Sequence, residues 1–179
     1  MSKYYKLRKD LSIDFLGHKL FRIECIKEIE AQPSVRVGDL GGYIEKEENL
    51  CDSAWVYGSA MVYGSAMVCD SARVYGSATV CDSAKVYGSA MVYGSAWVYG
   101  SARVKKDKVS KGDDLLNITS NTELYNITIL PKHIQIGCQC HSRTAWFKFK
   151  DSEIEKMDGE RALKFWKKWK PILKAICKE

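Results

Sequence analysis

The sequence of 179 residues lacks the features that mark an exported or membrane-spanning protein. Its hydrophobic runs are only a handful of residues long, far below the roughly 20 that cross a bilayer, and the charged segment 1–10 has no apolar stretch behind it. Seven cysteines, an odd number, occur without an export signal, which predicts free thiols in a reducing cytoplasm rather than a disulfide scaffold. We therefore expect a cytoplasmic protein that does not bind membranes.

Histidine is scarce, and an excess of one charge is absent from most of the chain. The three histidines are His18, His133 and His141, so none lies within residues 51–104. Lysine and arginine outnumber aspartate and glutamate by 28 to 22, and residues 160–179 hold seven basic and two acidic residues, which accounts for five of the six net charges. A basic surface over the whole molecule is thereby excluded, and any attraction to anions belongs to the C-terminal end.

What the sequence does contain is an uninterrupted repeat. Nine consecutive six-residue units run from Cys51 to Val104, each reading Tyr-Gly-Ser-Ala-x-Val or Cys-Asp-Ser-Ala-x-Val. This period is too short for a helical pair or a propeller blade, and valine with glycine or aspartate two positions later is typical of a short strand and a turn. Three units close a coil, and successive coils stack as parallel strands about 4.8 Å apart. The sequence therefore predicts an all-β parallel β-helix with inward columns of valine and alanine.

The segments on either side are predicted to cover the open strand edges of this stack. Alternating hydrophobic residues from Leu11 to Ile26, with a turn at Leu16–Lys19, predict an N-terminal β-hairpin. Apolar residues at helical spacing from Ala162 to Ile176 predict a C-terminal amphipathic helix, which Pro171 is expected to kink or restart.

Between the repeat and this helix the pattern is weaker. Ile118, Leu124, Leu130 and Ile136 recur every six residues, which predicts further, degenerate coils. The predicted units are residues 1–43 (N-terminal β cap), 44–104 (regular coils), 105–157 (degenerate coils with a strand-and-turn cap) and 158–179 (basic amphipathic helix).

Side chains that point away from the coils are the first candidates for a binding surface. Stacking gathers aromatic and methionine residues, Trp55 among them, on two faces, and an uncovered apolar patch of that size is typical of an interface. Alternatively, the stacked ladders only stabilise neighbouring coils, by roughly 0.2–1 kcal/mol per pair. We favour the interface, because packing alone does not require tryptophan or methionine at outward positions. The predicted binding residues on the coils are Tyr57, Tyr75, Tyr93, Met61, Trp97 and Tyr99.

Three units of the repeat carry cysteine, always followed by aspartate, whereas tyrosine is always followed by glycine. This linkage favours two interchangeable turn sequences over thiols selected for reactivity. Cys51 and Cys69 fall on adjacent coils, near the separation of about 5 Å at which a disulfide can form. Free thiols remain the expectation for the chain as a whole.

Metal-ligand residue types are densest between His133 and His141. Cys138 and Cys140 are predicted to point the same way from a strand, with His141 at the following turn, and thiolates together with imidazole suit zinc. However, Cys-x-Cys-His is not one of the strong zinc spacings. A nucleophilic Cys138 with a histidine base is the catalytic alternative. We favour a packed strand and turn, with no metal and no cofactor.

Basic and aromatic residues are interleaved in the predicted C-terminal helix. Lys167, Lys168 and Lys174 lie near Trp166 and Trp169, a combination that suits phosphate contacts and base stacking in nucleic-acid binding. The simpler interpretation is an apolar stripe packed on the core, with the lysines in solvent, and the sequence favours it.

The repeat and its flanks resemble known proteins. An aliphatic residue followed four positions later by a small one, throughout residues 51–104, resembles the left-handed hexapeptide β-helix family. Gly38–Glu45 with Glu48–Leu50, and Ile127–Ile129 through Trp146, resemble hexapeptide-repeat proteins of phages, prophages and gut bacteria, labelled as transferases or polymer-forming proteins. The resemblance implies a left-handed coil in a small trimeric or otherwise oligomeric protein, and a phage origin implies a counter-defence role.

Two functions from different classes follow. The first is a non-catalytic, homotrimeric binding protein that presents aromatic faces and a basic helix to a protein, a small molecule or nucleic acid. The alternative is a hexapeptide-repeat acyltransferase with His141 or His133 as its base. The transferases that the fold resembles carry a loop between coils and a histidine beside it, and residues 51–104 contain neither. The sequence therefore favours binding without turnover.

Overall fold

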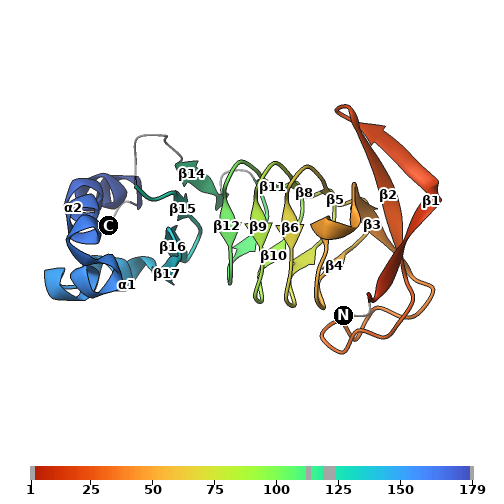
Figure 1. Ribbon diagram of the computed structural model, residues 1–179, viewed down its shortest axis with the longest axis horizontal. Coiled ribbons are helices and arrows are strands. Elements are labelled where there is room, and N and C mark those ends of the chain that lie inside the picture. The colour runs from red at the N-terminus through yellow and green to blue at the C-terminus, as the bar shows by residue number, and fades with distance from the viewer. Residues whose placement is uncertain (1–2, 112–113, 119–123, 178–179) are drawn as a thin grey trace.

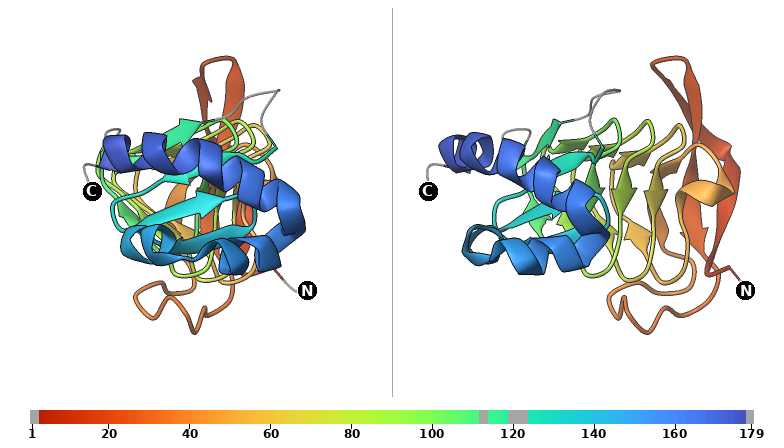
Figure 2. Two further views of the ribbon diagram at one scale, coloured as in Figure 1. Left: turned by 90° about the vertical axis from the view of Figure 1, so that its left-hand side faces the viewer. Right: turned by 60° about the vertical axis from the view of Figure 1, so that its left-hand side comes forward.

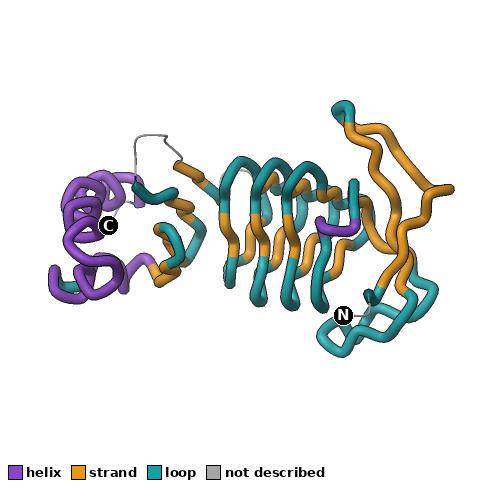
Figure 3. Tube along the Cα trace, in the orientation of Figure 1, coloured by secondary structure: helices purple, strands orange, loops and turns teal. Residues whose placement is uncertain are grey.

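The computed structural model describes residues 3–111, 114–118 and 124–177, which form an elongated molecule of three regions in a row (Figure 1). A β-hairpin lies at one end, a stack of short strands in the middle, and a small sheet with two helices at the other end. Figure 3 shows that these two helices are confined to the C-terminal end. No helix in the described ranges is long and apolar enough to cross a membrane.

The repeat forms a parallel β-solenoid, as the sequence predicts. Strands β3 to β9 each pair with a strand eighteen residues later, as Trp55 does with Arg73 and Val56 with Val74, and β10 pairs with β13 seventeen residues later. Three faces result, with the strand orders β3-β5-β8-β11, β4-β7-β10-β13 and β6-β9-β12. The strands are β3 (Leu40–Ile44), β4 (Trp55–Val56), β5 (Met61–Val62), β6 (Met67–Val68), β7 (Arg73–Val74), β8 (Thr79–Val80), β9 (Lys85–Val86), β10 (Met91–Val92), β11 (Trp97–Val98), β12 (Arg103–Val104) and β13 (Lys108–Val109), and a 3₁₀ turn, η1 (Glu47–Asn49), precedes the first full coil.

Valine and alanine fill the inside of the coils. Both residues of every unit are buried, with exposed fractions of 2% or less. Burial of one such valine contributes roughly 1.5–3 kcal/mol. The same hydrophobic cluster continues from Tyr5 in the hairpin to Leu130 behind the last coil, so the flanking segments close both ends of the stack.

The two turn sequences of the repeat adopt the same backbone conformation, which confirms that they are interchangeable. Asp52, Asp70 and Asp82 have φ between 53° and 58°, and the glycines at this position in the other units have φ between 60° and 73°. The left-handed conformation costs a residue with a Cβ about 1–2 kcal/mol. The aspartates offset this cost, because the carboxylates of Asp70 and Asp82 accept hydrogen bonds from Gly88 N and Gly100 N of the next coil, at 2.7 and 2.8 Å.

The N-terminal hairpin is also present as predicted. Strands β1 (Tyr5–Phe15) and β2 (His18–Cys25) pair antiparallel, and β2 pairs with β3, so the hairpin extends one face of the solenoid. Residues 26–39 then cross a second face, where the buried Gln32 side chain donates to the carbonyl oxygens of Ser53 and Ser71. Trp55 is only 1% exposed and belongs to the same hydrophobic cluster as Ile29 and Val35 of this segment, so its outward position is not a solvent position.

Cys51 and Cys69 form a disulfide, so the expectation of free thiols is wrong for this pair. They occupy the same position on adjacent coils, which brings their Cα atoms to 4.7 Å, within the range that a disulfide requires. Cys25, Cys81, Cys138 and Cys140 are free thiols.

The prediction of degenerate coils is wrong beyond β13. Strands β14 (Leu116–Ile118), β15 (Ile127–Ile129), β16 (His133–Ile136) and β17 (Gln139–Ser142) form an antiparallel sheet. The physical reason lies in the turns. Among the described residues, the left-handed residue that turns each coil recurs every six positions only up to Gly100, and the later turn at Gly137, with φ of 56°, reverses the chain. Of the four residues in six-residue spacing, Ile118 and Ile136 lie on these strands, Leu130 lies in the turn after β15, and Leu124 is exposed.

Two helices cover the outer face of this sheet (Figure 2). Helix α1 (Arg143–Lys148) is N-capped by Ser142, whose hydroxyl accepts a hydrogen bond from Ala145 N. Helix α2 (Asp151–Cys177) consists of two parts that meet at Asp158 and Gly159, the residues with non-helical dihedrals. The predicted C-terminal helix is therefore the second part of α2, and it restarts at Gly159 rather than at Pro171.

Candidate ligand-binding cavity in the C-terminal cap

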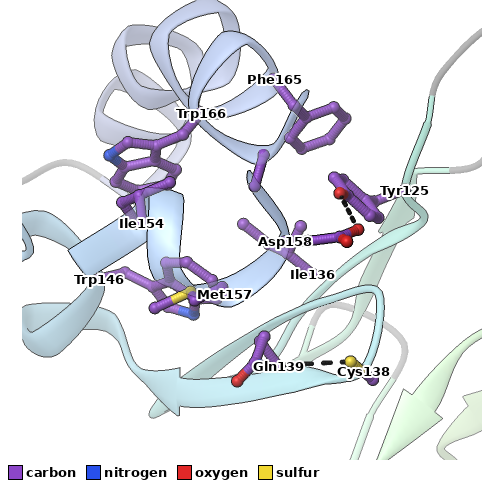
Figure 4. A pocket seen from close by; sticks show the side chains of 11 residues that line it. Tyr125, Ile136, Cys138, Gln139, Trp146, Ile154, Met157, Asp158, Phe165 and Trp166 are labelled. Atoms are coloured by element: carbon purple, nitrogen blue, oxygen red, sulfur yellow. Dashed lines mark hydrogen bonds between the residues drawn. The ribbon is translucent and has the colours of Figure 1, made fainter. Parts of the chain in front are cut away.

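The described segment 124–177, here called the C-terminal cap, contains a cavity of about 220 Å³ between the antiparallel sheet and the helices (Figure 4). Its walls are mainly aromatic and aliphatic, with a few polar groups. The residues that line it are Tyr125, Ile136, Cys138, Gln139, Trp146, Ile154, Met157, Asp158, Ala162, Phe165 and Trp166.

Four aromatic rings stand around the cavity in two pairs. The rings of Trp146 and Trp166 have centroids 5.2 Å apart, and those of Tyr125 and Phe165 are 5.0 Å apart and nearly perpendicular. Figure 4 shows the tryptophan pair on one side and the second pair on the other. The indole N–H of Trp146 donates to the buried carbonyl of Ile134 at 2.7 Å, which fixes the position of this ring.

The charged part of the wall is Asp158, at the break in α2. Gly159 has φ of 69°, a left-handed conformation that favours glycine, and the helix therefore changes direction directly after Asp158. One Asp158 oxygen accepts a hydrogen bond from the Tyr125 hydroxyl at 2.6 Å, and the other accepts one from the Arg161 guanidinium at 2.5 Å.

These hydrogen bonds set the protonation states in the cavity. Arg161 and, less strongly, Tyr125 hold the pKa of the Asp158 carboxyl below its usual range. Burial and the neighbouring carboxylate raise the pKa of Tyr125 to about 12. At neutral pH the wall therefore presents one carboxylate beside a neutral phenol.

The structure separates the thiol and imidazole groups that the sequence places together. Cys138 lies exposed in the turn before β17, not on a strand, while Cys140 lies half-buried on β17, where burial raises the pKa of its thiol. His141 follows on the same strand and points to the opposite face, because side chains alternate along a strand. There it packs against Trp146 and Phe149, and burial lowers the pKa of its imidazole.

In the described ranges, the group of possible metal ligands whose atoms all lie within 4.8 Å of one another is Cys51, Asp52 and Cys69, not the predicted set around His141. The two sulfur atoms of this group are joined in the disulfide. The thiols and imidazole near the cavity therefore do not converge on a common point.

His133 lies on the side of the sheet that faces the solenoid. Its Nδ1 is 2.8 Å from a carboxylate oxygen of Asp107, which is 3% exposed and sits just before β13. On the same strand, Gln135 Nε2 donates to the Tyr87 hydroxyl at 3.0 Å. These contacts attach the C-terminal cap to the last coils. Neither His133 nor His141 is among the residues that line the cavity.

The predicted tyrosine column is a half-buried ladder. The rings of Tyr75 and Tyr93 stack with centroids 5.1 Å apart, and Tyr57 meets Tyr75 nearly at a right angle. The hydroxyl of Tyr57 donates to Gln32 Oε1 at 3.0 Å, so the segment that buries Trp55 also contacts this column. The stabilising interpretation thus accounts for these three tyrosines.

The remaining predicted residues on the coils lie on the face that the hairpin extends. Met61 is half-buried next to the N-terminal hairpin, where Tyr63 packs against Phe15. Trp97 and Tyr99 are 43% and 51% exposed, and β11 is the edge strand of its sheet. Of the predicted coil residues, only these two present large exposed side chains.

The predicted lysines lie on the outer side of α2. Lys167 is exposed and pairs with Asp151 at 3.3 Å, and Lys168 and Lys174 are also exposed. Trp166 is buried in the core of the C-terminal cap, and Trp169 stacks on Phe165. The apolar stripe is therefore packed, and the tryptophans predicted to stack on bases belong to the core.

Sequence reasoning places Trp166 and Phe165 in a packed stripe and assigns no site to Tyr125 or Asp158. The available signal is the dipeptide Asp158-Gly159, because aspartate followed by glycine marks a turn inside an otherwise helical pattern.

The coils place the protein among the β-solenoid repeat proteins. A family model described as the YdcK beta solenoid repeat matches residues 84–100, which run from just before β9 to just after β11. The match covers a small part of the chain and does not include the C-terminal cap. No curated protein matches the chain.

Proposed function

We propose that the protein is a non-catalytic binding protein, in which the solenoid is a rigid support and the C-terminal cap holds a small, largely apolar molecule. The observation that carries the proposal is the cavity of about 220 Å³ with aromatic walls and one carboxylate. Ligand sites are typically concave and apolar, with a few placed polar groups. Because an apolar cavity of roughly 150 Å³ binds benzene, this one suits a ligand of one or two rings or of similar size.

Acyl transfer is less well supported by the geometry. A general base must reach the proton that it removes. His133 is engaged with Asp107 on the other side of the sheet, and His141 packs among aromatic rings outside the cavity lining. Binding without turnover therefore remains the function that we propose.

The proposal extends to self-association as a trimer through β11. Its support is the pair of exposed aromatic residues, Trp97 and Tyr99, on an edge strand. For the coils themselves we propose a left hand, on the resemblance of the repeat to hexapeptide β-helix proteins.

Indole, which matches the cavity in size and polarity, tests the binding proposal. Titration with indole is expected to raise the melting temperature, because a ligand that binds only the folded state stabilises it. Ala162→Leu fills the cavity from α2 and should remove this shift, whereas Ala175→Leu, the same change at an exposed position of α2, should retain it. A shift that survives Ala162→Leu would place the ligand elsewhere.

Sedimentation velocity tests the self-association. The wild-type chain is expected to sediment as a trimer at micromolar concentration, and Trp97→Glu should reduce its mass to that of a monomer. Lys85→Glu, an exposed outward change on β9, serves as the control and should leave the mass unchanged. A monomeric wild-type protein contradicts this part of the proposal.

A further inference from the structure

The cavity of the C-terminal cap has the composition of a site for an organic cation. Two tryptophans, a tyrosine and a phenylalanine supply its rings, and the faces of aromatic rings attract positive charge, tryptophan most strongly. Cages of such rings are the usual means by which proteins recognise quaternary ammonium groups. Asp158, the charged residue in the lining, adds a negative charge at the wall.

We propose that this cavity binds a compact quaternary ammonium cation, a positively charged nitrogen that carries only carbon substituents. The inference rests on the proposed function, since it names the chemical class of the ligand for the same cavity. Attraction between the cation and the ring faces is strengthened where water is excluded. The Asp158 side chain is 38% exposed, so it adds an attraction that water and salt partly screen.

The hydrogen bonds of Asp158 favour a quaternary over a primary ammonium group. Each of its oxygens already accepts one hydrogen bond, from Tyr125 or from Arg161, which leaves about two of the roughly four acceptor positions of a carboxylate. A primary ammonium brings three N–H donors, and those left without acceptors in an apolar cavity are costly to desolvate. A quaternary ammonium has no N–H donor. The negative charge of the carboxylate therefore attracts it without any hydrogen bond to the carboxylate oxygens.

Two cationic side chains lie near the cavity without lining it. Arg161 pairs with Asp158, but its side chain is 64% exposed, so water and salt screen its charge. Lys170 Nζ lies 5.6 Å from the centroid of the Trp166 ring, an interaction of the same kind that we propose for the ligand. Arg161 therefore weakens the attraction for a cation without blocking the cavity. Removal of its charge should accordingly strengthen the binding of a cation.

Choline and its neutral carbon isostere, 3,3-dimethylbutan-1-ol, separate charge from shape. In calorimetric titrations of the full chain, choline is expected to bind roughly tenfold more tightly than the isostere or better, because the isostere fills the same space without cation–π attraction.

Asp158→Asn should weaken choline binding and leave binding of the isostere unchanged. Arg161→Gln should strengthen choline binding only. Asp151→Asn, an exposed aspartate at the start of α2, is the matched control and should alter neither.

The outcomes distinguish this inference from the proposed function. If the isostere binds as tightly as choline, or if Asp158→Asn and Arg161→Gln leave choline binding unchanged, the cation site is refuted while a small-molecule cavity stands. If choline, the isostere and indole all fail to bind, the proposed function fails as well. Circular dichroism of each variant, matched to the wild type, shows that the fold is retained.

Discussion

The solenoid and the C-terminal cap fill their cores in opposite ways. In the coils one valine and one alanine recur in every unit, so each layer fits the next and all these side chains are buried. In the cap, large side chains such as Trp146, Trp166 and Ile154 pack without a repeated register and leave a cavity between them. The repeat therefore supplies a closed support, whereas the irregular segment has room for a ligand.

The largest expected effect is a charge placed inside the coils. Val74→Asp buries an unpaired carboxylate in a narrow apolar core, which costs several kcal/mol or more, and should abolish soluble expression. Lys85→Asp places the same side chain at an exposed outward position and should express normally. A folded Val74→Asp protein, judged by circular dichroism, would show that the coil core is more tolerant than its packing indicates.

The crosslink between the first coils should matter next. Loss of the Cys51–Cys69 disulfide, which joins residues separated by 18 positions, costs about 3 kcal/mol in the chain-entropy estimate. The measurement is the urea midpoint with and without dithiothreitol. Cys69→Ser should eliminate the effect of the reductant, and Cys140→Ser, which removes a free thiol, should preserve it.

One substitution made in both regions tests the comparison directly. Ala90→Leu overfills the coil core and should cost about 1–3 kcal/mol or more, because neighbouring layers cannot move apart independently. Ala162→Leu extends into the cavity and should change the free energy of unfolding by less than about 1 kcal/mol. Equal costs in chemical denaturation would mean that the cavity does not accept added volume.

Acid should weaken the cap through His141. Burial lowers the pKa of His141 below the ordinary histidine value of 6.5, so the unfolded chain binds more protons when the pH falls through that value. Stability should therefore decrease from pH 7 to pH 5, and it should decrease less in His141→Gln. The carboxyls of Asp158 and Glu160, whose pKa values are lowered, stay ionised in this window. Parallel pH profiles of the two proteins would contradict this assignment.

The smallest effect is expected from an exchange of turn sequences in the coils. Asp82→Gly relieves the left-handed backbone but loses the hydrogen bond to Gly100 N, so the two contributions should cancel to within about 1 kcal/mol. Asp82→Ala keeps the unfavourable left-handed conformation without the hydrogen bond. It should therefore lower the free energy of unfolding by about 1–2 kcal/mol more than Asp82→Gly does. Thermal unfolding of the three proteins gives both differences.

The coils could be predicted from the sequence because their structure is periodic. The turn residues and the Val and Ala columns recur at fixed spacing, so one unit determines the others. The burial of Trp55 could not be predicted, because it depends on where the non-periodic segment 26–39 crosses the solenoid. Likewise, Ile118 and Ile136 keep the six-residue spacing of the valines, but neither is followed two positions later by the glycine or aspartate that turns each coil. Both residues lie in an antiparallel sheet.

The cavity was beyond prediction for a related reason. Its walls join Tyr125 to Phe165, residues far apart in the sequence and without a shared period, and the connection depends on the break at Asp158 and Gly159. The helical spacing of apolar residues predicts which side of α2 packs on the sheet. It contains no information on how completely the large side chains fill the space between the helix and the sheet.

The constant register of the coils also determines how the chain can fold. Every regular strand pairs with a partner eighteen residues away, as Met67 does with Lys85 and Lys85 with Arg103. The loop that must close for each new coil is therefore the same length wherever the coil lies, and the entropy of closure does not grow as the stack lengthens. Folding can begin at any pair of coils and spread one turn at a time, a route that suits a chain emerging from the ribosome.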